Sequence, residues 1–232
     1  MHLLYSPDIT GKKYSLNEEE SNHAIRVLRL KQGDFIHLTD GKGAIYKAEI
    51  TESNHKKCML EVIDVQREYG KRDYYLHIAI APTKNISRFE WFLEKAVEIG
   101  IDEVTPIICD CSERKILKTI RLNKIIIAAM KQSLSAYLPR MNEAINYTDF
   151  ISTGFDGQKF IANCSEKITR LSICYKSQNN ALILIGPEGD FSQNELALAV
   201  KNGYNPVGLG KSRLRTETAA LVACHTINLI NE

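Results

Sequence analysis

The stretch that decides the fold is Leu182-Ile183-Leu184-Ile185-Gly186-Pro187-Glu188-Gly189-Asp190-Phe191-Ser192. It begins as an unbroken apolar run and changes abruptly to Gly-Pro-Glu-Gly. Such a run is typical of a strand buried on both faces of a parallel sheet. Ser192 and Glu195 have the Ser-x-x-Glu spacing of a capping box, which predicts that a helix begins there. The stretch is therefore expected to form a strand, a tight loop and a helix.

The same plan recurs in Leu209-Gly210-Lys211-Ser212-Arg213-Leu214-Arg215-Thr216-Glu217-Thr218-Ala219-Ala220. A short strand is expected just before it, over 205–209, and an apolar helix after it, over 219–230. The carboxyl ends of parallel strands meet at one edge of a sheet, and α/β proteins bind ligands there. Two strand–loop–helix units in succession therefore predict that both loops lie at a ligand-binding edge.

The sequence pattern changes near residue 72. Residues 1–72 read as short strands and turns with one helix over 18–30, which predicts a small β-barrel. The later residues alternate strands with helices, which predicts an α/β domain with a parallel sheet covered on both faces. The expected strands are 76–81, 103–108, 159–163, 181–185 and 205–209, and the main helices 87–99 and 118–138. Gly100 is expected to end the first of these helices.

The composition is that of a soluble globular protein, with 232 residues of which 44% are hydrophobic and 25% charged. No apolar run approaches membrane-spanning length, and residues 1–10 lack the core of a signal peptide. The six cysteines are scattered, and Cys109-x-Cys111 has no partner pair at zinc spacing. We therefore expect reduced thiols in a cytoplasmic protein without a metal site.

Basic residues are concentrated in two places although the net charge is only +2. The first group lies between Cys111 and Arg140, where Glu113 is the only acidic residue. The second group lies around residue 29. Local basic segments indicate either an anionic partner such as RNA or a solvated helix face, and the pattern alone favours neither. The basic residues are Arg26, Arg29, Lys31, Arg114, Lys115, Lys118, Arg121, Lys124, Lys131 and Arg140.

The two loops admit a structural and a functional interpretation. Gly-Pro-Glu-Gly by itself is typical of a turn. The spacing Gly208-x-Gly210-x-x-Arg213 lacks the third glycine of a dinucleotide-binding loop and lies too late in the chain. Neither loop alone therefore identifies a site.

The start of the helix after the second loop gives a stronger indication. Thr216 or Thr218 would cap it, and Glu217 suits its first turn. Arg213 and Arg215 have no such explanation, because the helix dipole disfavours cations at an amino terminus. They indicate an anion or a polar base nearby.

Taken together, 185–192 and 209–220 resemble the two carboxyl-terminal motifs of the RsmE-type ribosomal RNA methyltransferases, which belong to the SPOUT class. The resemblance extends over nearly the whole chain. Its further parts are the helix from Arg88 to Gly100, Ser112-x-Arg114, Gln132-Ser133 with Pro139, and His23-x-x-x-Val27-Leu28-Arg29.

The resemblance implies a PUA-like RNA-binding barrel over 1–72, followed over 73–232 by an α/β parallel-sheet domain with a trefoil knot. It implies a homodimer that binds S-adenosylmethionine among the knot loops. It also implies methylation at N3 of a uridine in 16S ribosomal RNA of the small subunit. Two positions depart from the family pattern, since Ser135 stands where relatives carry a cation and Asp190 where many carry a second glycine.

The resemblance also assigns residues to roles. Arg215 and Arg213 are candidates to stabilise negative charge on the uracil, and Glu217 to accept its proton, although Glu217 would serve equally as a helix-start anion. Leu209 and Leu214 would serve equally as core residues. The cofactor-pocket candidates are Gly186, Glu188, Gly189, Leu209, Gly210, Leu214 and Thr218. The candidates for RNA phosphates are Arg26, Arg29, Arg114, Lys115, Lys118 and Lys124.

Two other functions fit the same residues. One is a related knotted methyltransferase that acts on a ribose 2′-hydroxyl or another base. The other is a non-catalytic ribosome-assembly factor that binds RNA through its small barrel. Nucleoside analysis of the product and a test of S-adenosylmethionine binding distinguish the three.

Overall fold

The computed structural model describes residues 2–164 and 168–232, which form two compact units. One unit comprises Met1–Lys71 together with Met130–Leu138, and the other comprises Arg72–Ala129 together with Pro139–Glu232. The sequence did not predict that the distant segment 130–138 belongs to the first unit. It joins that unit through contacts such as the bond from Thr39 Oγ1 to the carbonyl of Ala136, 3.1 Å long.

The first unit is built on a curled half-barrel sheet of five strands, in the order β1-β3-β4-β5-β2. Strands β3, β4 and β5 were predicted, and their alternate residues fill the core beneath the sheet. Strands β1 and β2 were not predicted, because three residues are too few to show a period of two. The strands are β1 (Leu3–Tyr5), β2 (Lys13–Ser15), β3 (Phe35–Thr39), β4 (Ile45–Glu52) and β5 (Met59–Gln66).

Two helix predictions near this unit were too long. The helix expected over 18–30 is α1 (Glu18–Asn22), continued by a π-helical segment, η1 (His23–Val27). It stops there because Arg29 has a φ of 57°, which no right-handed helix accommodates. The helix expected over 118–138 is α3 (Thr119–Gln132), and Leu134, with a φ of 58°, lies beyond its end. In both cases a single left-handed residue ends the helix before the apolar pattern does.

The second unit contains a seven-stranded sheet with the order β12-β10-β11-β6-β7-β8, and β9 also pairs with β7. All of its strand pairs are parallel, as the alternating pattern predicted. The two-residue strands β8 and β9 were not predicted. The strands are β6 (Leu76–Ile80), β7 (Glu103–Ile108), β8 (Arg140–Met141), β9 (Ile145–Asn146), β10 (Gln158–Ala162), β11 (Ala181–Ile185) and β12 (Asn205–Val207).

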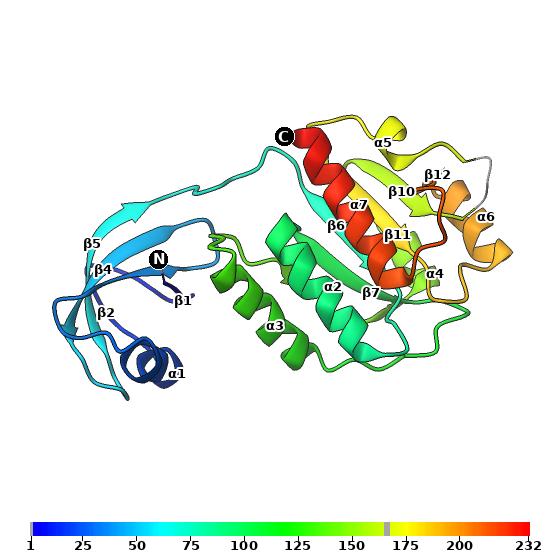
Figure 1. Ribbon diagram of the computed structural model, residues 1–232. Coiled ribbons are helices and arrows are strands. Elements are labelled where there is room, and N and C mark those ends of the chain that lie inside the picture. Colours follow the sequence, from blue (N-terminus) through cyan, green and yellow to red (C-terminus); the bar gives the residue numbers. More distant parts are fainter. Residues whose placement is uncertain (1, 165–167) are drawn as a thin grey trace. The chain divides into compact units, whose positions relative to one another are not determined.

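Helices cover both faces of this sheet (Figure 1). On one face α2 (Ile86–Ile99) packs beside α7 (Thr216–Asn231), which contacts the central strands β6 and β11. On the other face α4 (Tyr147–Ile151) and α6 (Gln193–Lys201) enclose a separate apolar core. The unit also contains the short α5 (Leu171–Cys174) and α3 as far as Ala129. Strands β6 and β11 are buried throughout, as their apolar sequences predicted.

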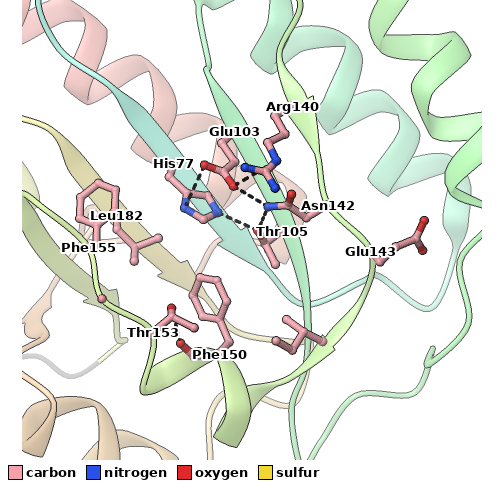
Figure 2. A pocket seen from close by; sticks show the side chains of 12 residues that line it. His77, Glu103, Thr105, Arg140, Asn142, Glu143, Phe150, Thr153, Phe155 and Leu182 are labelled. Carbon is pink, nitrogen blue, oxygen red and sulfur yellow. Dashed lines mark hydrogen bonds and ion pairs between the residues drawn. The ribbon is translucent and has the colours of Figure 1, made fainter.

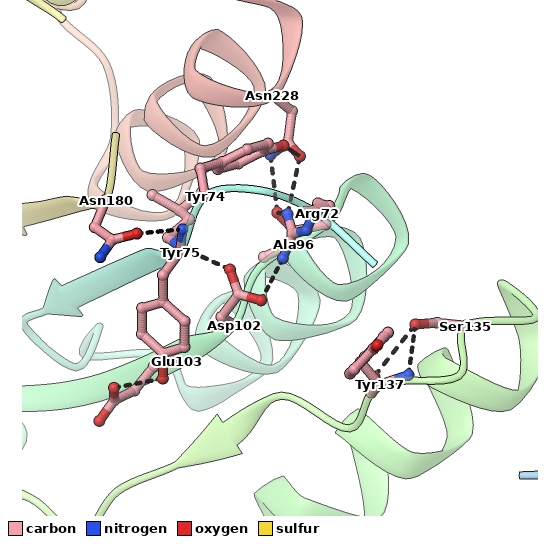
Figure 3. Close-up of polar contacts among 12 residues, drawn as sticks. Arg72, Tyr74, Tyr75, Ala96, Asp102, Glu103, Ser135, Tyr137, Asn180 and Asn228 are labelled. Atoms are coloured by element: carbon pink, nitrogen blue, oxygen red, sulfur yellow. Dashed lines mark hydrogen bonds and ion pairs between the residues drawn. The ribbon is translucent and has the colours of Figure 1, made fainter. Parts of the chain in front are cut away.

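A partly buried polar network around the buried Asn228 holds the start of this unit against α7 (Figure 3). The guanidinium of Arg72 donates to the carbonyl of Gly100 at 2.8 Å and pairs with Asp102 at 2.6 Å. Asn228 on α7 accepts from Arg72 at 3.1 Å and from the Tyr74 hydroxyl at 2.6 Å, and its own amide donates to the carbonyl of Gly100. Asn228 therefore satisfies three polar groups that folding removes from water.

We expect Asn228→Ala to lower the free energy of unfolding by about 2–3 kcal/mol, because it leaves these buried groups short of a partner. Denaturant unfolding followed by circular dichroism measures the change. The control is His225→Ala on the exposed side of the same helix, for which we expect a change within about 0.5 kcal/mol. Equal unfolding midpoints for the two variants would contradict the role of Asn228.

Candidate active site

The loops after β6, β7, β11 and β12 lie at the carboxyl edge of the parallel sheet. The predicted placement of the loops after β11 and β12 at one edge is therefore confirmed. Helices α2 and α7 also begin at this edge. Their unpaired backbone N–H groups consequently face the same region as the loops.

Glu195 joins two of these loops. Its side chain is buried, and its carboxylate accepts from the N–H of Asp110 at 2.9 Å and from the N–H of Ser192 at 2.8 Å. The second of these bonds, with the bond from the N–H of Glu195 to Ser192 Oγ, is the predicted capping box at the start of α6. Ser192 Oγ also donates to Asp110 at 2.7 Å. The loops after β7 and β11 are thereby fixed to one another.

Glu188 and Arg114 both hold the loop after β6. The Glu188 carboxylate accepts from the N–H of Lys84 at 2.9 Å, so this cofactor candidate has a structural partner. The Arg114 guanidinium donates to the carbonyls of Thr83 and Lys84 at 2.8–3.2 Å. Arg114 was expected to contact RNA phosphates, and that contact stays a prediction beside these observed bonds to loop backbone. Both residues therefore hold the loop after β6 in place at the carboxyl edge of the sheet.

The loop after β11 has little room for side chains. A Cβ atom at Gly186 would lie 3.0 Å from the ring of Phe191, and one at Gly189 would lie 3.0 Å from Cβ of Cys111. Asp190 has a φ of 67°, and its carboxylate accepts from the next N–H at 2.8 Å. This left-handed conformation suits glycine best and aspartate next, which explains why a second glycine of the motif can be replaced here.

The loop after β12 ends in a helix start without a side-chain cap. Helix α7 begins at Thr216, earlier than predicted, and its N-cap residue is Arg215, whose side chain makes no capping bond. The prediction that Thr216 or Thr218 caps the helix is therefore wrong, because both lie inside it. Arg213 and Arg215 are exposed. Arg213 and Arg215, for which the described residues show no ion pair, thus stand beside a helix start without a side-chain cap.

Glu217 faces Arg88 across the starts of α7 and α2. Only 6% of Glu217 is exposed, and its Oε1 lies 3.8 Å from Nε of Arg88. Its Oε2 is buried and has no hydrogen-bond partner within the described residues. Sequence reasoning missed this pair. The predicted order of strands and helices could have indicated it, because two helices that begin at the same edge of a sheet and cover the same face bring their first turns together.

The structure places the other predicted residues as follows. Leu209, Leu214 and Thr218 are half-buried, and Gly210 is exposed with a φ of 156°. The remaining RNA candidates are exposed side chains. Lys115 and Lys118 lie between β7 and α3, Lys124 lies on α3, and Arg26 and Arg29 belong to the first unit.

Residues 2–164 and 168–232 contain neither a membrane-spanning helix nor a cluster of metal ligands. None of the helices there is long and apolar enough to cross a membrane. No group of three or more His, Cys, Asp or Glu side chains in that part of the chain is arranged to hold a metal ion. All six cysteines are free.

Comparison with known proteins gives consistent matches over the whole chain. Residues 71–228 match the family described as RNA methyltransferase domain, and residues 16–63 match the RNA methyltransferase PUA domain. The chain is 30% identical to the ribosomal RNA small subunit methyltransferase E of Synechocystis sp., over 99% of this chain and 78% of the relative. The chain belongs to the ribosomal RNA small subunit methyltransferase E family.

Solved structures agree with this family assignment. A crystal structure of a probable rRNA-methyltransferase from Porphyromonas gingivalis is 42% identical, with a TM-score of 0.93, and covers 100% of this chain and 98% of that one. A ribosomal RNA small subunit methyltransferase E from Neisseria gonorrhoeae, solved bound to S-adenosyl methionine, is 25% identical, with a TM-score of 0.89 over 100% and 98% of the two chains. The family fold therefore extends over both units.

The position of Glu188 allows a direct test of how the edge is held. We expect Glu188→Ala to raise the hydrogen-exchange rate of the Lys84 amide about fivefold, since one hydrogen bond of about 1 kcal/mol is lost. Exchange monitored by NMR or mass spectrometry gives the rate. Glu113→Ala is the matched control, because Glu113 pairs with the ammonium of Lys84 and leaves its amide untouched. Equal rates in both variants would show that Glu188 does not hold this loop.

Proposed function

We propose that this family member transfers a methyl group from S-adenosylmethionine to N3 of a uridine in 16S ribosomal RNA of the small subunit, in the cytoplasm. The observation that carries the proposal is the match to relatives named ribosomal RNA small subunit methyltransferase E over nearly the full chain. The Neisseria gonorrhoeae relative bound to S-adenosyl methionine supports the cofactor. The N3 position rests on the motifs at 185–192 and 209–220.

The carboxyl edge suits S-adenosylmethionine, which supplies a methyl group on a positively charged sulfonium. Gly210 has open space around it, so a ligand can approach its backbone closely. The uncovered amide groups at the start of α7 are suited to polar atoms of the cofactor or the substrate. We assign the pocket to Gly186, Gly189, Leu209, Gly210, Leu214 and Thr218, with Glu188 as the residue that holds the neighbouring loop.

Arg215 and Arg213 are suited to stabilise the reacting uracil. N3 of uracil must lose its proton before it attacks the methyl carbon, and negative charge then spreads over O2 and O4. Exposed guanidinium groups beside a helix amino terminus without a side-chain cap form a preorganised positive region for this charge. We assign Arg215 as the main donor because it directly precedes the helix, and Arg213 as the second.

Glu217 is suited to accept the N3 proton or to direct a water that does so. Its buried Oε2 lacks a partner among residues 2–164 and 168–232, and a buried carboxylate oxygen without a donor is costly unless a ligand supplies one. Arg88 lies close enough to compensate part of the charge of Glu217. Its burial and its position beside Arg88 support a role for Glu217 beyond that of a helix-start anion.

The knot, the oligomeric state and the role of the amino-terminal module are proposed from the family. We infer that the chain after β11 forms the trefoil knot of the SPOUT class. We also infer that the enzyme is a homodimer, because α2 and α7 expose Trp91 by 43% and Leu229 by 56%, an apolar area that a second copy would cover. The PUA-type match supports an RNA-binding role for the amino-terminal module, with Arg26 and Arg29 contacting phosphates.

Methylation of 30S subunits with labelled S-adenosylmethionine tests the proposal. We expect label in 16S ribosomal RNA, and nucleoside mass spectrometry should identify it as 3-methyluridine. A 2′-O-methylated nucleoside or another methylated base would overturn the assigned target. Failure to bind S-adenosylmethionine, together with tight binding of ribosomal RNA, would overturn the enzymatic function itself.

Arg215→Ala tests the role of the main donor. We expect kcat to fall about 100-fold, because a preorganised charge-stabilising group is lost, while the Kd for S-adenosylmethionine stays within about threefold. Methyl-transfer kinetics and calorimetry measure the two constants. Lys211→Ala, an exposed cation of the same loop, is the control, and its kcat should be close to that of the unaltered chain. An unchanged kcat for Arg215→Ala would remove this residue from the mechanism.

A further inference from the structure

A cavity of about 310 Å³ lies in the second unit beside the amino-terminal parts of the central strands, and Figure 2 shows the side chains that line it. His77, Glu103 and Leu182, near the amino ends of β6, β7 and β11, form part of its wall. The segment 140–145 and the residues around α4 close it. Its volume is at the lower end of the range for ligand sites, about 300–1,000 Å³.

One wall of this cavity carries a carboxylate with unused acceptor capacity. Glu103 accepts from Nδ2 of Asn142 at 2.5 Å and from the hydroxyl of Tyr75 at 2.8 Å. A carboxylate offers about four lone-pair positions, so further donors can bind. Burial raises the pKa of Glu103, but hydrogen bonds and neighbouring charge lower it overall. Glu103 is therefore ionised at neutral pH.

Arg140 places a cation beside this carboxylate at the mouth of the cavity. Its side chain is 73% exposed, and its Nε lies 4.0 Å from Glu103, beyond hydrogen-bond distance. The described residues give its guanidinium no hydrogen-bond acceptor. Figure 2 shows Arg140 and Glu103 side by side at one end of the cavity. A ligand at this end of the cavity therefore finds the Glu103 carboxylate as an acceptor and the Arg140 guanidinium as a donor next to each other.

The opposite wall is apolar and aromatic. Phe150 and Phe155 come from α4 and the loop after it, and Leu182 from β11. The ring of His77 packs edge-on against Phe150 with centroids 5.7 Å apart. His77 is only 6% exposed, and burial lowers its pKa to about 4, against the opposing effect of Glu103. His77 is therefore neutral and adds aromatic surface. A flat ring suits this wall better than a flexible chain.

The charges of the cavity exclude a polyphosphate as the preferred ligand. Glu103 and Glu143 line it against the single cation Arg140, and His77 is neutral. An anion with several charges would be repelled, whereas an uncharged heteroaromatic ring with polar atoms along one edge would not. The ligand must donate to Glu103, accept from Arg140 and lie against the phenylalanine rings.

We propose that this cavity is a second ligand site, separate from the active site, that binds a guanine base. Guanine carries two adjacent donors, N1–H and the 2-amino group, which match the two oxygens of Glu103, and its O6 accepts from Arg140. Adenine and cytosine lack two adjacent donors beside an acceptor, and uracil has a single ring donor between two acceptors. The base belongs either to a free nucleoside or to a single-stranded RNA segment, and the site is independent of methyl transfer.

Calorimetry on the full chain with guanosine tests the site, with S-adenosylmethionine present at saturation so that the active site is occupied. We expect guanosine to bind with a Kd below about 1 mM. Inosine, which lacks the 2-amino group, should bind about tenfold more weakly, and adenosine more weakly still. Absence of binding at 5 mM guanosine, equal affinity for adenosine, or loss of guanosine binding on addition of S-adenosylmethionine would each overturn the proposal.

A short single-stranded oligoribonucleotide distinguishes the two sources of the base. If the site takes a base from RNA, an oligomer with one guanine in an adenine context should compete with guanosine, and the all-adenine oligomer should not. If it takes a free nucleoside, neither oligomer should compete. Competition by both oligomers to the same extent would contradict recognition of guanine at this site.

Two variants connect the binding to the named residues. Arg140→Gln should weaken guanosine about tenfold, and Glu103→Gln should remove the preference for guanosine over inosine. Arg121→Gln is the matched control, since Arg121 is an exposed arginine paired with Glu90 outside the cavity. Thermal unfolding checks that each variant folds. If Glu103→Gln does not fold, Arg140→Gln tests the site alone, because the side chain of Arg140 is exposed. An unchanged guanosine affinity in Arg140→Gln would overturn the assignment of the site.

Discussion

The buried carboxylate of Glu195 is the interaction on which the active-site edge depends. A carboxyl group away from water is costly unless donors surround it, and here two backbone N–H groups from different loops supply them. The carbonyl of the same residue accepts from the hydroxyl of Tyr147, so α4 is fixed as well. Loops that are ordered before a ligand arrives do not have to be ordered by it. The edge therefore binds with a smaller entropic cost than free loops would.

The parallel sheet explains why distant segments meet at this edge. Strands β6 and β11 are neighbours in the sheet although a hundred residues of chain separate them. Their carboxyl ends place the loop at Lys84 next to the loop at Glu188, and the bond between these two residues is a direct result. Helices α2 and α7 begin at the same edge, which brings Arg88 to Glu217. The site is thus a property of sheet topology more than of any single motif.

Much of this arrangement could be predicted from the sequence, because the relevant signals are local. The apolar run 181–185, the capping box at Ser192 and Glu195, and the glycine that ends α2 each act within a few residues. The contact of Glu195 with Asp110 could not be predicted, since it joins segments far apart in the chain. The same limit applies to the bonds that join Glu188 and Arg114 to backbone groups of another loop, while the ligand contacts predicted for these two residues stay predictions. The helix ends at Arg29 and Leu134 depend on left-handed backbone that neither residue type favours.

The position of α7 in the chain has a consequence for how the enzyme becomes active during synthesis. Helix α7 covers the central strands on one face, and its first turn supplies Glu217. A chain made only as far as residue 215 can pair β6 with β11, yet it leaves their apolar face open to water and lacks half of the Arg88–Glu217 pair. Such non-local sheets form slowly, and exposed strands of this kind attract chaperones or aggregate. Helix α7 therefore completes two features in the same step, because it covers the apolar face of β6 and β11 and places Glu217 beside Arg88.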